Sequence, residues 1–403
     1  MVPSVLVKTF PSPPAPLPKG EGGKPFSPGR RVGMRETVFS SQDSYVFFVV
    51  INCYSEELMK SKFFTVTLAA LVCALLLGGA AWAQNVKITP LGSHAGELCG
   101  RDRATLFEDP SGVRILYDAG HSTLGAEDPR LGEIHGVLLS HAHGDHFGDM
   151  KMKALGEGPC DAPTIVPAGA NGVTAEIAAA KNAAMIAVVD LSVFLGRKIE
   201  IITGKPTPLC SMAGGGTTVP LAAPCRSNIH LGGTHVLKTA SAQQGVEISI
   251  VHAAHANSLP LSVISEPERK VLAANGLAFA PGPPVGFVVK FTNGLTVYLS
   301  GDTGIHTEMK SIVNEYHKAN LALFNLGPNA LTAMSGAYAI NELVRPAAVI
   351  VTHVNEIGTI GGKLNPNSRT AAFSKLVKRP VHLAISGRTM EFDGKASCVT
   401  GCN

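Results

Sequence analysis

The stretch His141-Ala142-His143-Gly144-Asp145-His146 places four potential metal ligands within six residues. Imidazole nitrogens and carboxylate oxygens are the ligand types that suit zinc, iron or manganese. Three histidines and one aspartate at the spacing H-x-H-x-D-H are difficult to explain by packing alone. The sequence therefore predicts a metal site at this motif.

Three more ionisable residues follow apolar runs, as the motif itself does. The run Gly136–Ser140 before the motif predicts a short strand buried on both faces. His255, Asp302 and His353 each follow a similar run. An ionisable side chain at such a place is costly to bury unless it has a partner. With the motif, these residues make five histidines and two aspartates, which is enough to bind two adjacent metal ions.

The pattern of apolar runs and turn residues predicts the elements that position these ligands. The dipeptide Asn293-Gly294 indicates a tight hairpin. Residues 204–234, rich in Gly, Pro, Thr and Ser, predict an irregular insertion or a hairpin excursion. Strands first, a helix, strands again and then α/β alternation favour a sheet sandwich with outer helices. The expected strands are Val86–Leu91, Thr105–Glu108, Arg114–Tyr117, Val137–Ser140, Val246–His252, Val285–Thr292, Leu295–Ser300, Leu321–Asn325 and Ala347–Thr352, and the expected helices are Gly172–Ala184, Glu308–Lys318 and Ser335–Val344.

The first 83 residues show the pattern of a secretory signal preceded by an upstream segment. Met59–Lys62 is basic, Phe63–Leu77 is apolar, and Ala81-Trp82-Ala83 offers small residues for cleavage before Gln84. The apolar run is short for a membrane span. We expect translation to start at Met59, residues 1–58 to be non-native or disordered, and residues 59–83 to be removed. Residues 84–403 would then form a single domain that is periplasmic or secreted.

Charge and composition limit the classes of molecule that the protein is expected to bind. The chain has 403 residues, 45% of them hydrophobic, so it can bury a substantial core. After the predicted cleavage the formal charge is about +1, with no basic block. This favours a small-molecule substrate over nucleic acid or an anionic membrane surface, and no membrane anchor remains. The oligomeric state is left open.

Six cysteines remain after the predicted cleavage, and an even number in an exported protein suggests disulfides. Cys210–Cys225 and Cys398–Cys402 are the easiest local pairs, which leaves Cys99–Cys160. Six cysteines allow about 15 connectivities, so this pairing is one hypothesis among several. Free buried thiols are the alternative.

The ligand motifs and their order resemble the metallo-β-lactamase superfamily. The resemblance covers about residues 86–392 and rests on the H-x-H-x-D-H motif, the later lone histidine, Gly301-Asp302-Thr303, and the final His353. The segment from Tyr298 to Gly304, followed by Glu308-Met309, and the later Met334-x-x-x-Tyr338-Ala339 are similar to one branch. That branch contains uncharacterised metal-dependent hydrolases and ascorbate-6-phosphate lactonase-like proteins.

The resemblance implies an αββα sandwich, with two mixed β-sheets flanked by helices and a metal centre at one edge. It implies two divalent ions, zinc with manganese or iron as alternatives, that share a bridging hydroxide at neutral pH. Asp145 would also orient this nucleophile, which makes it the candidate catalytic residue. The first ion would be held by His141, His143 and His255, the second by Asp145, His146 and His353, and both by Asp302.

Two assignments near the expected strand ends have alternatives. His252 lies three residues before His255, and strand alternation would place them on opposite faces, so only one should be a ligand. We expect His255, because the ligand of the family follows the strand and lies next to small residues. Asn355 and Glu356 follow His353 closely. We expect them to lie in a solvated loop, with substrate contact as the alternative.

The ligand types at these positions also differ between members of the superfamily that have different activities. True β-lactamases of the fold have Cys or Ser where Asp302 stands, and di-iron oxygen reductases have Glu where His143 stands. Branches that process RNA add basic elements that this chain lacks. We therefore expect hydrolysis of a small ester, lactone or phosphodiester. The alternatives are a periplasmic β-lactamase-like amide hydrolase and a non-catalytic, metal-stabilised binding protein.

Overall fold

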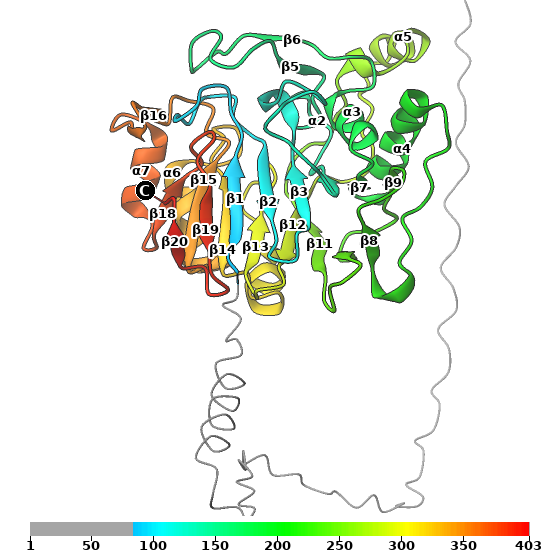
Figure 1. Cartoon of the computed structure of the whole chain (residues 1–403). Helices are drawn as coiled ribbons and strands as arrows, with labels where there is room; N and C mark the ends of the chain where they lie inside the picture. Colours follow the sequence, from blue (N-terminus) through cyan, green and yellow to red (C-terminus); the bar gives the residue numbers. More distant parts are fainter. Residues whose placement is uncertain (1–83, 403) are drawn as a thin grey trace, which may run out of the picture. The chain divides into compact units, whose positions relative to one another are not determined.

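The computed structural model describes residues 84–402. The expected upstream segment (1–58) and signal peptide (59–83) therefore lie outside the described residues. Two eight-stranded mixed sheets dominate the described part, and helices flank them (Figure 1). The predicted α/β sandwich of two mixed sheets is confirmed.

The first sheet is antiparallel at one edge and parallel at the other. Its order is β20-β19-β1-β2-β3-β4-β7-β9, and the pairs from β3 to β9 are parallel. The strands are β1 (Val86–Pro90), β2 (Thr105–Glu108), β3 (Arg114–Tyr117), β4 (Gly136–Leu138), β7 (Ala184–Ile186), β9 (Cys225–Arg226), β19 (Met390–Phe392) and β20 (Cys398–Thr400).

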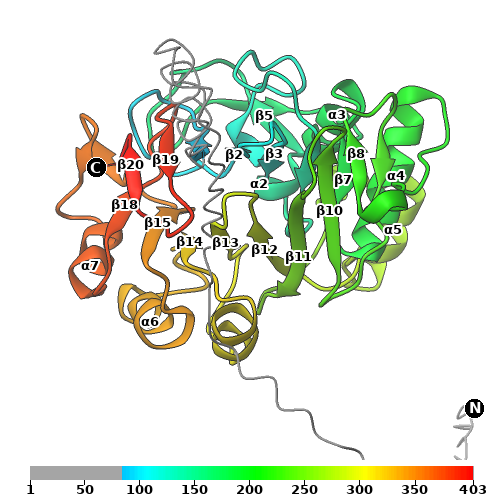
Figure 2. The same cartoon turned by 60° about the horizontal axis from the view of Figure 1, so that its bottom comes forward.

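The second sheet has the order β18-β15-β14-β13-β12-β11-β10-β8, and β13, β14, β15 and β18 run parallel. Figure 2 shows β10 to β15 side by side. The strands are β8 (Thr217–Val219), β10 (Thr234–Thr239), β11 (Val246–His252), β12 (Val285–Lys290), β13 (Thr296–Leu299), β14 (Leu321–Asn325), β15 (Ala348–Thr352) and β18 (Val381–Leu383). Two small hairpins stand apart from both sheets, β5 (Met150–Met152) with β6 (Ile165–Pro167) and β16 (Thr359–Ile360) with β17 (Lys363–Leu364).

The two sheets pack face to face through buried aromatic side chains. Phe107 of β2 stacks on Phe291, with 5.8 Å between the ring centroids. Tyr117 of β3 meets Phe287 of β12 edge to face at 6.2 Å. The Tyr117 hydroxyl also accepts a hydrogen bond from the Gly301 amide at 3.0 Å. These contacts bury apolar area, the main stabilising term in folding, and fix the separation of the sheets near the predicted ligand Asp302.

Helices cover the outer faces of the sandwich. α3 (Val173–Ala180) and α4 (Val189–Thr203) pack on the first sheet at β4 and β7. On the second sheet, Phe373 of α7 stacks on Phe324 of β14. The remaining elements are the α-helices α2 (Gly144–Phe147), α5 (Glu266–Ala274), α6 (Ala333–Tyr338) and α7 (Arg369–Leu376), the π-helices η4 (Met309–Tyr316) and η5 (Ala339–Val344), and the 3-10 turns η1 (Gly120–Ser122), η2 (Ala213–Gly215) and η3 (Leu261–Val263).

Two expectations about local structure are wrong in part. The helix expected over Gly172–Ala184 ends at Ala180, because Asn182 turns the chain with φ +49° and Ala184 then enters β7. The tertiary pairing of β7 between β4 and β9 overrides the local helix propensity of the alanines. Residues 204–234, expected to be irregular, supply β8 and β9 at the edges of the two sheets.

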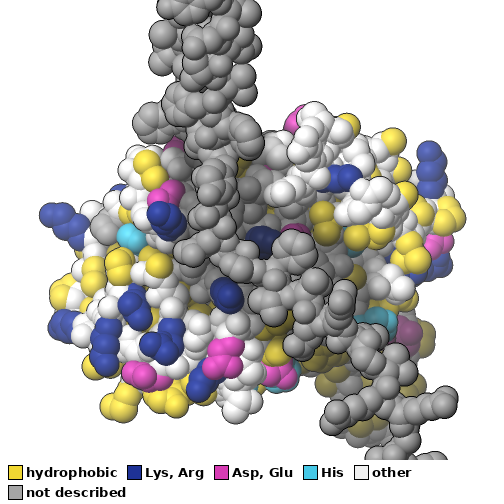
Figure 3. All heavy atoms as spheres, turned by 90° about the horizontal axis from the view of Figure 1, so that it is seen from below, with side chains coloured by type: hydrophobic (Ala, Val, Ile, Leu, Met, Phe, Trp, Pro, Cys, Tyr) yellow, Lys and Arg dark blue, Asp and Glu magenta, His cyan; other side chains and the backbone are white. Residues whose placement is uncertain are grey.

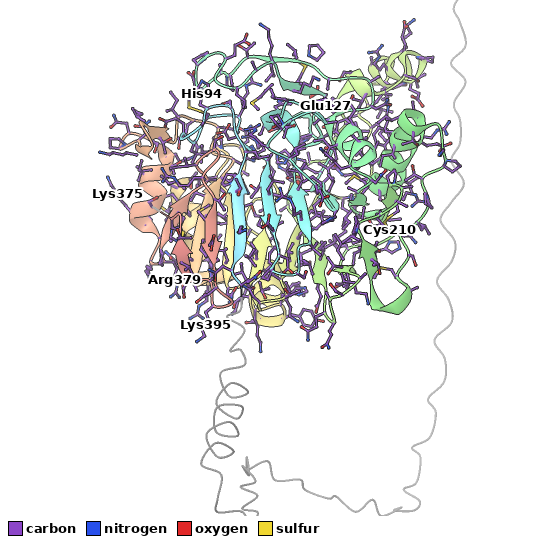
Figure 4. All side chains as sticks on the ribbon, in the orientation of Figure 1. His94, Glu127, Cys210, Lys375, Arg379 and Lys395 are labelled. Carbon is purple, nitrogen blue, oxygen red and sulfur yellow. A yellow bond between two sulfur atoms is a disulfide. The ribbon has the colours of Figure 1, made fainter. Side chains whose placement is uncertain are left out.

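The six cysteines of the described residues form three disulfides. Cys210 pairs with Cys225, Cys398 with Cys402, and Cys99 with Cys160. Cys210 lies on the side of the molecule that carries β8 and β9 (Figure 4). The pairing agrees with the expected connectivity.

The surface carries mixed charge. The face opposite the end that bears α2 shows basic and acidic side chains interspersed with hydrophobic and neutral ones (Figure 3). Among the described residues, the helices are too short or too polar to cross a membrane.

Candidate metal centre

All seven predicted ligands lie together at one edge of the sandwich. His141 follows β4, His255 follows β11, Asp302 follows β13 and His353 follows β15. Strands β11, β13 and β15 run in the same direction, so their carboxyl ends meet at the same edge. Three overlapping groups have ligand atoms within 4.8 Å of one another: His141, His143 and His255; His141, His146 and Asp302; and Asp145, His146 and His353.

The spacing of the motif follows from one short helical turn. His143 precedes α2 with extended backbone, and Asp145 and His146 lie in the turn, which ends at Gly148 in the left-handed conformation. Gly120 packs against this turn with φ +45°, and a Cβ there would overlap the carbonyl oxygen of Asp145. Only glycine combines that backbone conformation with so close an approach. The glycine therefore holds Asp145 and His146 toward the sheet edge.

Asp118 orients two of the histidines through a hydrogen-bond chain. Its Oδ2 lies 2.7 Å from Nδ1 of His146 and also accepts from the Ser140 hydroxyl at 2.7 Å. Ser140 Oγ in turn lies 2.9 Å from Nδ1 of His141. A carboxylate only accepts, so both imidazoles carry their proton on Nδ1. Their Nε2 atoms then face the centre, as ligand nitrogens do when a carboxylate supports the ring.

Several buried polar atoms at the centre lack a hydrogen bond within the described part of the chain. They are Nε2 of His146, Oδ1 of Asp302 and Nδ1 of His353, although Asp302 Oδ1 lies 3.3 Å from Nε2 of His146 and contacts Nδ1 of His353. A buried polar atom without a hydrogen bond is costly. A divalent cation would satisfy all three atoms, and the donor set of imidazoles and carboxylates suits such an ion. The residues present therefore fit the metals that the motif predicts.

The charges of the buried side chains at the centre also indicate a site for cations. Burial alone would lower the pKa of His146, but the carboxylates of Asp302, Asp118 and Asp145 raise this pKa well above its usual value. Burial would raise the pKa of Asp302, but His353 and His146 hold it well below its usual range. The buried carboxylates thus require positive charge beside them, and divalent ions would supply it directly.

Arg103 holds Asp145 from the side opposite the histidines. Its Nε and Nη2 atoms both donate to Oδ2 of Asp145 at 3.2 Å. The Arg103 side chain is only 4% exposed, whereas that of Asp145 is 34% exposed. Burial would raise the pKa of Asp145, but two neighbouring histidines and the guanidinium keep this pKa well below its usual range. Asp145 is therefore ionised and fixed in direction.

Two cavities adjoin the ligands. One of about 170 Å³ is lined by His143, Asp145, His255, Asp302, Gly327, Asn329, Ala330, His353 and Asn355. The other, about 500 Å³, is lined by Arg101, Arg103, His121, Asp149, Pro260 and further residues. Asp145 and Asn355 line both cavities, so they stand where the two meet. An apolar cavity of about 590 Å³ between α4 and α5 has none of the ligands in its lining.

The histidines outside the ligand set lie in different surroundings. His252 stacks edge to face on His306 at 5.0 Å, while His255 Nε2 lies 3.6 Å from Asp302 Oδ2. His255 thus lies beside the other predicted ligands, and its role as a ligand stays a prediction. His121 lies 2.9 Å from Asp149 and lines the larger cavity. His94 lies near the upper edge in Figure 4 and bonds to Ser93 and Gly158.

Asp118, Arg103 and Asn257 are not among the site residues predicted from the sequence motifs. Asp118 follows the apolar strand β3, so the rule that found the other strand-end ligands applies to it as well. Asn257 accepts a hydrogen bond from the Ala142 amide at 2.6 Å and so holds the motif loop. Arg103 precedes a strand and carries no comparable signal.

Comparisons with known proteins find relatives among metal-dependent hydrolases. No protein-family model matches the chain. A UPF0173 metal-dependent hydrolase of Staphylococcus carnosus (strain TM300) is 24% identical over 304 residues, covering 74% of this chain and 100% of the relative. One of Polaromonas sp. (strain JS666 / ATCC BAA-500) is 26% identical over 299 residues, covering 72% and 86%. The chain is similar to metal-dependent hydrolases. This confirms the resemblance that the motifs predict.

Among solved structures, Igni18 of Ignicoccus hospitalis KIN4/I, titled a novel metallo hydrolase, is 21% identical with a TM-score of 0.47. The match covers 77% of this chain and 99% of Igni18.

The assignment of each ligand to a particular ion stays a prediction.

Proposed function

We propose that the protein is a metal-dependent hydrolase with two divalent ions that cleaves a small ester, lactone or phosphodiester. Zinc is the proposed metal, with manganese or iron as alternatives that the same donors accept. The observation that carries the proposal is the clustering of possible ligands in two groups. One is His141, His143 and His255, the other is Asp145, His146 and His353, and a third group of His141, His146 and Asp302 joins them. The similarity to metal-dependent hydrolases over most of the chain supports it.

The residues divide between the two ions by proximity. His141, His143 and His255 would hold one, and Asp145, His146 and His353 the other. Asp302 lies near His146, His255 and His353 and would contact both ions. When bound, such a pair of ions lowers the pKa of water and polarises the bond under attack.

The surrounding side chains supply orientation. Asp118 keeps the protons of His141 and His146 on the nitrogens that face away from the centre. Arg103 holds Asp145 in one direction, so that its carboxylate can accept a hydrogen bond from the attacking water and orient it. The 170 Å³ cavity has room for a small reacting group, and the adjoining 500 Å³ cavity for the rest of the substrate.

Two other functions are less well supported. A β-lactamase-like amide hydrolase is disfavoured because Asp302 stands where β-lactamases of the superfamily have Cys or Ser. A non-catalytic binding protein is disfavoured because the complete donor set is present and opens onto cavities. We further propose a small-molecule substrate and a periplasmic or secreted location, which the three disulfides and the leader pattern support.

Elemental analysis of natively expressed protein, followed by a substrate panel on the same sample, tests the proposal. We expect about two metal ions per chain and turnover of at least one ester, lactone or phosphodiester. Turnover confined to β-lactams would favour the amide hydrolase. Full metal occupancy without turnover on any class would favour the binding protein and reject the hydrolase.

A further inference from the structure

Asn355 stands between a buried arginine and the cavity that adjoins the metal ligands. It follows His353 by two residues, in the loop after β15, and has φ +50°, a conformation that asparagine tolerates better than most residues. Its side chain lines both the 170 Å³ and the 500 Å³ cavities. It is therefore in reach of a substrate at either place.

Arg103 determines which way the Asn355 amide faces. Arg103 Nη2 donates a short hydrogen bond to Asn355 Oδ1. A guanidinium has no acceptor, so the amide oxygen must face Arg103 and the amide nitrogen must face away. Asn355 Nδ2 lies 3.8 Å from the position that a Cβ would occupy at Gly327, which lines the smaller cavity. The NH₂ group, which makes no hydrogen bond within residues 84–402, thus borders the space next to the ligands.

The guanidinium that imposes this orientation cannot turn freely. Its Nη1 donates to the carbonyl oxygens of Gly100 and Asp102 at 3.2 and 3.1 Å. Nε and one Nη2 hydrogen go to Asp145, and the remaining Nη2 hydrogen goes to Asn355. All five N–H groups of a nearly buried side chain are used. Any rotation would leave buried donors unpaired, which is costly.

The loop that carries Asn355 is anchored on its other side. The Glu356 carboxylate accepts from the amides of Arg369 and Thr370 at the start of α7, at 2.9 and 2.8 Å. Arg369 donates to the Val354 carbonyl oxygen. Donors held in place before the reaction stabilise developing charge better than donors that must reorganise. Asn355 is such a donor.

We propose that Asn355 Nδ2 donates a hydrogen bond to the substrate oxygen that gains negative charge, and that Arg103 is its positioning residue. This rests on the proposed hydrolase function. For an ester or lactone, water gives up one proton to solvent as its oxygen adds to the carbonyl carbon, and the π electron pair moves onto the oxygen that faces Asn355. The pair then returns, the bond to the leaving oxygen breaks, and that oxygen takes up a proton. The recognised feature is a carbonyl or phosphoryl oxygen.

The first test compares turnover of p-nitrophenyl acetate, γ-butyrolactone and bis(p-nitrophenyl) phosphate. Asn355→Ala should lower kcat by about 10² with little change in KM, as loss of one oxyanion donor does. Asn355→Asp keeps the size of the side chain but removes the donor, so the loss should be similar. Asn367→Ala, at an exposed asparagine before α7, is the matched control and should match wild type. An Asn355→Ala enzyme within twofold of wild type would overturn the proposal.

The second test does not depend on turnover. Inorganic phosphate is titrated into zinc-loaded protein by calorimetry, after metal content is shown to be equal. Asn355→Ala should weaken phosphate binding about tenfold, the loss of roughly one good hydrogen bond. Equal phosphate affinity rejects the role of Asn355. If wild type turns over none of the probes, the proposed hydrolase function is rejected. The phosphate titration then tests the role of Asn355 by itself.

The role of Arg103 is tested by combining substitutions at Arg103 and Asn355. Arg103→Lys keeps the charge but lacks the fork that bonds Asp145 and Asn355 together. We expect weaker phosphate binding in Arg103→Lys and no further loss when Asn355→Ala is added. Independent, additive losses from the two substitutions would show that Arg103 does not position Asn355.

Discussion

The imidazole of His146 and the carboxylate of Asp118 form a buried pair, with 2.7 Å between Nδ1 and Oδ2. Asp118 is 1% exposed and His146 3%. Asp118→Asn keeps an acceptor for the Ser140 amide but weakens the bond that fixes the His146 ring. Loss of such a supporting carboxylate lowers metal affinity about 10- to 100-fold. Chelator competition should show this loss, and Asp393→Asn, at a half-buried aspartate just after β19, should not; unchanged affinity in Asp118→Asn would contradict the assignment.

Replacement of Asp145 should separate catalysis from folding. Asp145→Ala should remove turnover, because the carboxylate that orients the attacking water is gone. It also leaves buried Arg103 without its partner, which should cost about 1–3 kcal/mol of unfolding free energy. Asp145→Asn keeps an acceptor for Arg103 and should unfold closer to wild type, still without turnover. Activity retained in both variants, at full folding by circular dichroism, would show that the mechanism is wrong.

Metal stoichiometry should distinguish the two candidate histidines after β11. His255→Ala removes a ligand of the first group, so elemental analysis should find about one ion per chain where wild type holds about two. His252→Ala, the matched control, loses only its ring contact with His306 and should keep both ions. The reverse result would identify His252 as the ligand.

The Cys99–Cys160 disulfide should stabilise the protein more than Cys398–Cys402. The first closes a loop with a sequence separation of 61 and the second one of 4. Chain entropy then predicts losses of about 4 and about 2 kcal/mol when each pair is replaced by serine. Urea unfolding of the two double-serine variants measures the difference. Equal losses would mean that strain or unfolded-state structure outweighs the entropy of loop closure.

His235 should make stability depend on pH. Burial lowers the pKa of His235 to about 4 from 6.5, and its side chain is 2% exposed. The unfolded chain therefore binds the proton first, so stability is full above pH 6.5 and falls as pH drops toward 4. Protonation of this group lowers the free energy of unfolding by about 3 kcal/mol in total across that window. His235→Gln should unfold with a shallower pH dependence over that window; an unchanged slope would contradict the assignment.

The sheet strands and the ligand edge could be predicted from the sequence, whereas some of the helices could not. Thr105–Glu108, Arg114–Tyr117, Val246–His252 and Leu321–Asn325 form strands with the expected bounds, because each is a short, largely apolar run that contains β-branched or aromatic residues. α4 was not predicted. Its buried Leu191, Leu195 and Ile199 recur every four residues, but Gly196 and the β-branched residues lower its helix propensity.

The supporting residues of the site differ in how well a sequence can reveal them. Asp118 ends an apolar strand and shares that signal with Asp302 and His353. Arg103 bonds to Asp145 and Asn355, which are 42 and 252 positions away, so nothing near it in sequence marks it. The contact with Asn355 joins loops of the two sheets, and long-range contacts of this kind leave no local pattern.

The order of the ligands along the chain determines when each group can be complete. His141, His143 and His255 are all present once synthesis has passed Ala256, whereas His353 joins Asp145 and His146 only after the last parallel strands are made. The first group therefore becomes available to an ion before the second. A chain that stops before β15 can assemble only the earlier of the two. Completion of the second group thus reports that translation has reached the end of β15 and that both sheets have docked.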